Sequence, residues 1–467
     1  MARTLVANAR LLATLDDAGR RLPGGSVLIE DGAVEAVFEA GAAPAPAPDW
    51  RVLDAAGLLV TPGLVNTHHH LYQTLTRNLP AAQDVPLFPW LRTHYEIWRA
   101  LTAEALETAT RTALAQLMLS GCTLTSDHQY LFPKDAPPDL IDRQIAVARE
   151  LGIRFQPTRG SMSLCKKSGG LPPDDLCQDE ATILADCRRL IAAHHDPAPG
   201  AMTRIDLAPC SPFSVTEDLM RQTSALAREA GVRLHTHVAE TLDEERFCLE
   251  RVGLRPVAYM ESLGWTGPDV WYAHAVQLDD AEVRRLGETG TGVAHCPGSN
   301  MRLGSGIARV RELLDAGAPV GLAVDGSASN DADHLLAEAR LMLLASRLRG
   351  EGALWLTAAD VWHCATRGGA AVLGRGDVGS IEPARRADLA LWDLDTLELA
   401  GAGSDPLAAL LFSAAAPRVH TLLVEGEVRV ADGRIPGLDE RAQAARHNAA
   451  AEALLARAAD LAGRDPA

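Results

Sequence analysis

Short apolar segments alternate with longer helical segments through the middle of this chain, and no other feature of the sequence constrains the fold as strongly. The helical segments include Ala103–Ser120, Glu217–Ala230 and Ala281–Glu288. The candidate strands are Leu64–His70, Cys122–His128, Arg154–Ser161, Arg204–Cys210, Val232–Val238, Val270–Ala275, Gly292–Cys296 and Val320–Asp325. Alternation of this kind favours a parallel sheet. Eight β/α units in a stretch of this length match a (β/α)8 TIM barrel, which takes about 250 residues or somewhat more with insertions.

The two ends of the chain have a different texture, with short strands separated by turns. Ser26–Glu30 and Ala33–Phe38 flank Asp31-Gly32, a pairing typical of a hairpin. The last stretch, Glu440–Ala462, is rich in Ala and Arg and indicates an amphipathic helix. We therefore predict an α/β protein with three parts: a barrel over residues 61–379, a small β-sandwich domain built from residues 1–60 and 380–435, and a C-terminal helix over residues 436–467.

The charge of the chain limits its partners. The net charge is −17, from 61 acidic and 44 basic residues among 467. An acidic surface repels nucleic-acid backbones and anionic membranes, so we expect a free small molecule as substrate, no nucleic acid and no membrane association. No apolar run reaches the ~20 residues of a membrane span, and the N-terminus lacks the apolar core of a signal peptide.

The cysteines indicate the compartment. Eight cysteines are widely separated and none forms a C-x-x-C pair. This spacing favours reduced thiols and therefore a cytoplasmic protein. We also expect the chain to form a homo-oligomer.

Polar residues gather at the C-terminal ends of most of the predicted strands. They are His68, His70, Asp127, His128, Arg159, Ser161, His235, His237, His274, His295 and Asp325. In a (β/α)8 barrel those ends converge on one face, where active sites lie. Residues that are far apart in the sequence are therefore predicted to meet in one pocket.

Two of these groups have the spacing of metal ligands. On a strand, alternate residues share a face, so His68 and His70 point the same way and offer half of a zinc site. His235-Thr236-His237 repeats the pattern, and one of its two histidines should complete the set. Asp325 ends an apolar run, where a carboxylate is costly unless it is paired or bound to metal. Asp325-Gly326 is also compatible with a simple turn.

Several segments resemble the motifs of the amidohydrolase superfamily, in order along nearly the whole chain. The segments are Pro62–His70, His235–Glu240, Ala273–Val276, Val293–Asn300, Val324–Asn330 and Ile381–Leu389. The resemblance implies that His68, His70, His237 and Asp325 are the metal ligands. It also implies that Glu240 and His274 are the proton-handling pair of the deaminase and aminohydrolase branch. Another branch bridges two metals with a modified lysine, but Ala208–Pro212 contains no lysine, so the resemblance implies one metal ion.

Within this superfamily the chain is most similar to the subgroup that deaminates 8-oxoguanine. The segments that carry this likeness are His70–Arg77, Leu87–Leu91, Ser120–Thr123, Ser126–Pro133, Arg159–Ser163 and Gly169–Asp174. Gln129 and Cys165 depart from the subgroup pattern. The resemblance implies a zinc-dependent deaminase of a free purine-like or pyrimidine-like heterocycle, converting 8-oxoguanine to urate plus ammonia. Isocytosine deaminases and triazine amino- or chlorohydrolases look similar in these segments, and a non-catalytic zinc-binding scaffold is the alternative of another class.

The expected mechanism assigns each catalytic residue a task. A metal-activated water attacks the ring carbon that bears the amine, and Asp325 takes its proton and passes it to the departing ammonia. Glu240 protonates the adjacent ring nitrogen, which requires a raised pKa, and His274 hydrogen-bonds the attacking oxygen. Zinc and ferrous iron suit the same ligands. The candidate substrate contacts are Gln73, Trp90, Arg159 and Ser161. The alternative to a substrate role is a loop amide for Gln73 and simple packing for Trp90.

Overall fold

Eight parallel strands form the centre of the protein in the computed structural model, which describes residues 3–463. Each strand pairs with its neighbours in sequence, as in a (β/α)8 barrel. The strands are β8 (Leu64–Asn66), β9 (Cys122–Gln129), β10 (Arg154–Ser161), β11 (Asp206–Pro209), β12 (Leu234–Val238), β13 (Val270–His274), β14 (Gly292–His295) and β15 (Val320–Leu322). The predicted barrel is confirmed, and every strand coincides with a predicted segment.

The barrel closes between its first and last strands. The main-chain N–H of Thr67 donates to Leu322 O over 3.1 Å, and that of Asp325 donates to His68 O over 3.2 Å. The regular ladder of β8 ends at Asn66, so His68, His69 and His70 lie just beyond the strand and not within it. This difference has a physical cause, because the chain turns at this point into the 3₁₀ helix η1 (Leu71–Thr76).

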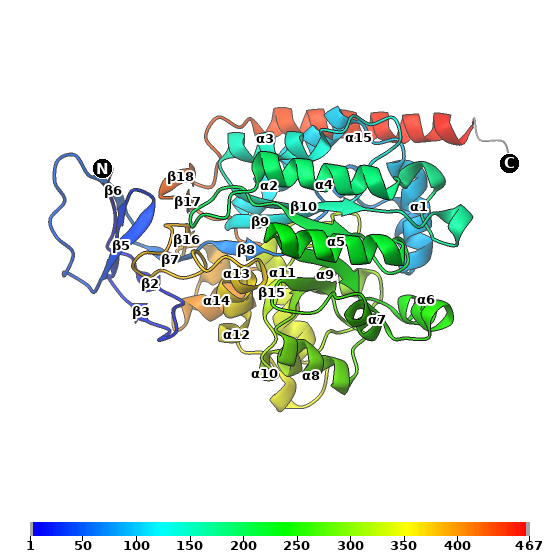
Figure 1. The fold of residues 1–467 in the computed structure, drawn as a ribbon. Coiled ribbons are helices and arrows are strands. Elements are labelled where there is room, and N and C mark those ends of the chain that lie inside the picture. Colours follow the sequence, from blue (N-terminus) through cyan, green and yellow to red (C-terminus); the bar gives the residue numbers. More distant parts are fainter. Residues whose placement is uncertain (1–2, 464–467) are drawn as a thin grey trace.

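Helices surround the barrel, as Figure 1 shows. Three of them coincide with predicted helical segments: Ala103–Leu119 (α2), Glu217–Ala230 (α5) and Asp280–Thr289 (α8). The α-helices up to the end of the barrel are α1 (Leu87–Trp98), α2 (Ala103–Leu119), α3 (Leu140–Leu151), α4 (Glu180–His194), α5 (Glu217–Ala230), α6 (Leu242–Val252), α7 (Pro256–Ser262), α8 (Asp280–Thr289), α9 (Pro297–Arg302), α10 (Val310–Asp315), α11 (Leu335–Ser346), α12 (Ala358–His363) and α13 (Gly369–Val372). Within residues 3–463, no helix combines the length and apolar character needed to cross a bilayer.

The two chain ends build a second β-rich region beside the barrel (Figure 1). One sheet has the order β5-β4-β1-β6 and the other the order β18-β17-β16-β7-β2-β3. Buried side chains from both sheets, such as Val27, Ile29, Leu389 and Leu423, form one apolar cluster, as in a sandwich. The strands are β1 (Arg3–Ala7), β2 (Leu11–Ala13), β3 (Arg21–Leu22), β4 (Ser26–Glu30), β5 (Ala33–Phe38), β6 (Arg51–Asp54), β7 (Leu58–Pro62), β16 (Leu389–Asp393), β17 (Thr421–Val424) and β18 (Glu427–Val430).

The long C-terminal helix α15 (Glu440–Ala462) lies across the outside of the barrel (Figure 1). Gln443 Nε2 donates to Thr108 O on α2, and His447 Nε2 donates to Thr74 O in η1. The helix therefore supports the segment that follows the first barrel strand. A shorter helix, α14 (Pro406–Phe412), lies between β16 and β17 in the chain. The last predicted helical positions, residues 464–467, lie outside the described residues.

Candidate active site

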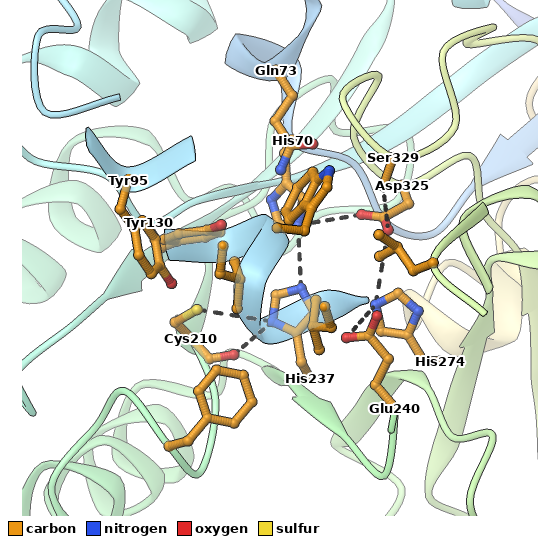
Figure 2. Close-up of a pocket in the computed structure, with 15 residues that line it drawn as sticks. His70, Gln73, Tyr95, Tyr130, Cys210, His237, Glu240, His274, Asp325 and Ser329 are labelled. Atoms are coloured by element: carbon orange, nitrogen blue, oxygen red, sulfur yellow. Dashed lines mark hydrogen bonds and ion pairs between the residues drawn. The ribbon is translucent and has the colours of Figure 1, made fainter. Parts of the chain in front are cut away.

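Three imidazoles and one carboxylate meet at the C-terminal end of the barrel. His68 and His70 follow β8, His237 lies in β12 and Asp325 follows β15. Asp325 Oδ1 lies 3.3 Å from His68 Nε2 and 3.4 Å from His70 Nε2, and His70 Nε2 lies 3.2 Å from His237 Nε2. All four side chains are buried. The predicted metal ligands are thus brought together by three different parts of the barrel, as Figure 2 shows for His70, His237 and Asp325.

The tautomers of His70 and His237 follow from their main-chain partners. His70 Nδ1 lies 2.9 Å from His128 O, and His237 Nδ1 lies 2.6 Å from Cys210 O. A carbonyl oxygen only accepts, so each Nδ1 carries the proton and donates it. Both Nε2 atoms are therefore unprotonated and direct lone pairs at each other.

A hydrogen bond to His235 fixes the tautomer of His68, so that its Nδ1 also carries the proton. His235 Nδ1 donates to Trp271 O over 3.0 Å, so its Nε2 is an acceptor. His68 Nδ1 lies 2.7 Å from that acceptor and must be the donor. His68 Nε2, which has no hydrogen-bond partner among the described residues, therefore directs a third lone pair toward Asp325.

A metal ion fits this arrangement. Zinc binds imidazole nitrogen and carboxylate oxygen at about 2.0–2.2 Å, so the corners of a tetrahedral site lie about 3.4 Å apart. The three measured separations of 3.2, 3.3 and 3.4 Å match that value. Three lone pairs and a carboxylate repel one another unless a cation lies between them.

The electrostatics of the cluster keep its ligands in the metal-binding form. Burial lowers the pKa of His68 and His237 well below the usual value and that of His70 to about 4, so the imidazoles are neutral. Burial opposes ionisation of Asp325, but the close contact with His68 and the nearby charge of His274 hold its pKa well below the usual value. The site thus presents neutral imidazoles and an ionised carboxylate at neutral pH.

Glu240 and His274 lie beside this cluster. His274 Nε2 is 3.5 Å from Glu240 Oε2 and 3.9 Å from Asp325 Oδ2, and His274 Nδ1 is 3.0 Å from Asn300 Oδ1, which accepts its proton (Figure 2). Burial raises the pKa of Glu240 to about 7. Although burial opposes it, the charges of Glu240 and Asp325 raise the pKa of His274. The pair can therefore hold and transfer a proton near neutral pH.

Comparison with known families identifies the chain. The model of the amidohydrolase family matches residues 59–429. The chain belongs to the amidohydrolase family. This amidohydrolase is 52% identical to 8-oxoguanine deaminase of Pseudomonas aeruginosa, over 98% of this chain and 100% of that protein. It is 37% identical to isoxanthopterin deaminase of an unknown prokaryotic organism, over 93% of this chain and 94% of that protein.

A solved structure resembles the amidohydrolase over almost its whole length. The structure of atrazine chlorohydrolase from Arthrobacter aurescens TC1 complexed with zinc matches with a TM-score of 0.91 and 33% identity. The match covers 96% of this chain and 100% of that chain. Together with the buried groups of histidine and aspartate donors around His68, this likeness supports a metal-ion site in the amidohydrolase.

The amidohydrolase cavity extends from the metal cluster into an apolar region. Gln73 and Trp90, two of the predicted substrate contacts, line it. The cavity is also lined by side chains that the sequence did not indicate, which are Leu87, Leu91, Tyr95, Tyr130, Cys210, Phe213, Leu303 and Ser329. Tyr130 and Cys210 directly follow strand ends, so their position was a usable signal. Tyr95 comes from helix α1, where nothing in the sequence marks it as a site residue.

Arg159 and Ser161 are not among the residues that line the amidohydrolase cavity. Arg159 Nε donates to Asp186 on the surrounding helix α4 over 2.6 Å, and its guanidinium lies 3.8 Å from the centre of the Phe132 ring. Because side chains alternate along β10, Ser161 shares that outward face. The expected contact of Arg159 is therefore corrected, because its guanidinium faces the helices, whereas a substrate contact by Ser161 stays a prediction.

Proposed function

We propose that this chain hydrolytically deaminates 8-oxoguanine, releasing urate and ammonia. The observation that carries the proposal is the position of the Glu240–His274 pair, whose Nε2 to Oε2 separation is 3.5 Å, in the same cavity as the metal cluster. A proton donor and a metal-activated water are the two groups that hydrolysis of a ring amidine needs. The 52% identity to 8-oxoguanine deaminase over 98% of the chain supports the choice of ring.

One zinc ion per chain would be held by His68, His70, His237 and Asp325, and ferrous iron would suit the same donors. When bound, the metal supplies Lewis-acid activation of water at neutral pH. The histidine tautomers described above leave three lone pairs free for this role.

The proton transfers fall to three side chains. Asp325 Oδ2 would accept a proton from the attacking water and later deliver it to ammonia; Ser329 Oγ, which donates to that oxygen over 3.2 Å, holds the carboxylate in place. Glu240 Oε1 has no partner among the described residues and would give its proton to the ring nitrogen next to the reacting carbon. His274 would hydrogen-bond the attacking oxygen while Asn300 fixes its tautomer. As the C–N bond breaks, the amine would leave as ammonia with the proton held by Asp325. The proton that remains on the new oxygen would return to Glu240 as the carbonyl forms, so one water is consumed for each ammonia released.

Substrate binding would use Gln73 and Trp90. Gln73 Oε1 is buried without a partner in the described residues, so it is available to a ring N–H. Trp90 is held by a hydrogen bond from its Nε1 to Ala328 O, which would present its ring as a packing surface. The cavity encloses about 30 Å³, far below the roughly 300–1,000 Å³ of typical small-molecule sites, so lining side chains must move when a bicyclic ring enters.

Two other reactions on this scaffold are the alternatives. Isocytosine has the same amidine group as the pyrimidine part of 8-oxoguanine. Hydrolysis of an amino- or chlorotriazine is favoured by the likeness to atrazine chlorohydrolase at a TM-score of 0.91. A non-catalytic zinc-binding scaffold would have no use for the buried acid–base pair Glu240 and His274 beside its metal ligands.

We also propose a cytoplasmic homo-oligomer that acts on free small molecules and not on nucleic acid. The net charge of −17 disfavours polyanionic partners. The cysteines are all unpaired in the described part of the chain, which suits a reducing compartment. Size-exclusion chromatography with light scattering tests the oligomeric state.

One substrate panel tests the proposal. The metal-loaded enzyme is incubated with 8-oxoguanine, isocytosine, guanine, an aminotriazine and a chlorotriazine, and ammonia and chloride are both measured. The expected result is ammonia release with the highest kcat/KM for 8-oxoguanine. Preference for isocytosine or chloride release from the triazine would replace the assigned substrate, and no turnover of any ring would contradict the enzyme assignment.

A further inference from the structure

Helix α6 begins in an unusual way, directly after the proposed proton donor. Its first residue is preceded by Thr241, whose side chain makes no capping hydrogen bond. Instead, the carboxylate of Glu244 reaches back past Thr241. Glu244 Oε1 accepts the N–H of Ala239 and Oε2 accepts the N–H of Glu240, each over 2.8 Å. Glu244 is completely buried, so these two bonds take the place of hydration.

The segment that Glu244 holds is strained. Ala239 has a φ of 55°, a left-handed conformation that residues with a Cβ seldom adopt. Its carbonyl oxygen accepts the N–H groups of Val276 over 2.9 Å and Gln277 over 2.8 Å, just beyond His274. The bend is therefore held from both sides, by Glu244 at its N–H and by the segment after β13 at its carbonyl.

This bend sets the direction of the Glu240 side chain. Glu240 lines the cavity and points toward His274 (Figure 2). Its Oε2 has the His274 contact at 3.5 Å, whereas its Oε1 has no partner among the described residues. Few side-chain contacts hold the carboxyl group in place, so its position depends on the backbone that carries it.

We propose that Glu244 is a positioning residue, which holds the Ala239–Glu240 backbone so that the Glu240 carboxyl faces the reacting ring nitrogen. This inference rests on the proposed function, because it assigns Glu244 an effect through the proton donor. Glu244 does not line the cavity, so it is given no contact with substrate.

Helix α8 provides a matched control. Glu282 occupies the same third position of its helix and is also buried, but its Oε2 accepts the N–H of the cap residue Asp279 over 2.9 Å in an ordinary capping box. Glu282 thus binds the N–H of its own cap residue, whereas Glu244 binds the N–H groups of Ala239 and Glu240. Glu282 also accepts from Arg255 over 3.0 and 2.8 Å, so Glu282→Gln should weaken its helix start at least as much as Glu244→Gln does, without altering the backbone of the proton donor.

The test compares Glu244→Gln with Glu282→Gln. A glutamine keeps one acceptor oxygen but turns an NH2 group toward the second backbone N–H, so one of the two bonds is lost. We expect Glu244→Gln to lower kcat by about 10- to 100-fold, as for other residues that orient a functional side chain, with KM and bound metal nearly unchanged. Glu244→Asp, which keeps both acceptor oxygens, should retain more turnover. Glu282→Gln should leave kcat unchanged, and an equal loss of kcat in both glutamine variants would overturn the proposal.

A double-variant cycle separates positioning from general damage. If Glu244 acts through Glu240, then adding Glu244→Gln to Glu240→Gln should cause no further loss of the residual turnover. An equal fold-loss in both backgrounds would overturn the positioning role. Should Glu244→Gln fail to fold, Glu244→Asp takes its place in the cycle.

The same cycle tests the proposed function separately. If Glu240→Gln alone keeps full turnover, then the proton-donor assignment fails and the positioning role fails with it. If Glu240→Gln is inactive but Glu244→Gln and Glu244→Asp both keep the wild-type kcat, then only the positioning role fails.

Discussion

His70 and His237 face each other at the open end of the barrel, with their Nε2 atoms 3.2 Å apart. The Nδ1 atom of each ring donates to a main-chain carbonyl, so neither Nε2 has a proton to offer the other. Two lone pairs at this distance repel, and a cation between them changes the repulsion into attraction. A metal ion bound here would therefore supply a reaction centre and would also stabilise the folded chain.

Metal removal is expected to abolish turnover and to lower the melting temperature by several degrees. A ligand present at 100 times its Kd stabilises the folded state by about 2.7 kcal/mol if the unfolded chain does not bind it. Thermal unfolding and activity are measured with a strong chelator and again after zinc is returned. His237→Ala lacks one proposed ligand and should show a smaller effect of the chelator. Full activity of the chelated wild type would contradict the metal assignment.

The pH dependence of kcat is expected to have an alkaline limit near pH 7 that depends on Glu240. Burial raises the pKa of its carboxyl to about 7. A proton donor acts only in its protonated form, so kcat is full below that pKa and falls as the pH rises through it. Glu240→Gln should lower kcat by about 10²–10⁴-fold and remove this limit while metal is retained.

The control for Glu240 is Asp243→Asn, which removes the carboxylate of a surface ion pair with Arg246. It should leave kcat and its pH profile unchanged. A Glu240→Gln variant with the same alkaline limit as the wild type would assign the titration to another group.

Gln73→Ala is expected to raise KM by about 5- to 30-fold, the effect of losing one buried hydrogen bond to the ring. The amide lies directly against Gly326, where any side chain would collide with Gln73 Oε1, so its place in the cavity is tightly confined. Gln83→Ala, at an exposed amide nearby in the chain, is the control and should not change KM. If Gln73→Ala keeps the wild-type KM, then Gln73 is a loop amide without a substrate role.

Arg159→Met is expected to lower the free energy of unfolding by about 1–3 kcal/mol without changing KM. The buried guanidinium pairs with Asp186, which also pairs with Arg189, so the carboxylate does not lose every partner. Urea unfolding and steady-state kinetics at low temperature separate the two effects. A rise in KM at unchanged stability would return Arg159 to the substrate site.

The barrel could be predicted because its pattern is local. Each strand and the helix that follows it are formed by consecutive residues, and the order of strands in the sheet follows their order in the chain. The hairpin at Asp31-Gly32 is local in the same way, and β4 pairs with β5 there. The histidines at the strand ends could be assigned to one face because all parallel strands of a barrel end on the same side.

The choice between His235 and His237 was not decided by spacing, because both lie on one face of β12. The choice depends on how close each histidine lies to the C-terminal end of β12, where the cluster is. His237 Nε2 lies 3.2 Å from His70 Nε2 within the cluster, whereas His235 Nε2 accepts a hydrogen bond from His68 Nδ1. The outward orientation of Arg159 was not written in the sequence either, because it depends on which face of β10 meets the helices.

The local order of residues in this chain was thus enough to predict the barrel and the candidate ligands His68, His70 and Asp325. Periodicity and strand polarity are properties of neighbouring residues, so they can be interpreted without coordinates. The cavity wall, the tautomers of the histidines and the hold of Glu244 on Glu240 arise from contacts between distant segments. Those contacts exist only once the strands have closed into a barrel, which is why the folded structure alone could reveal them.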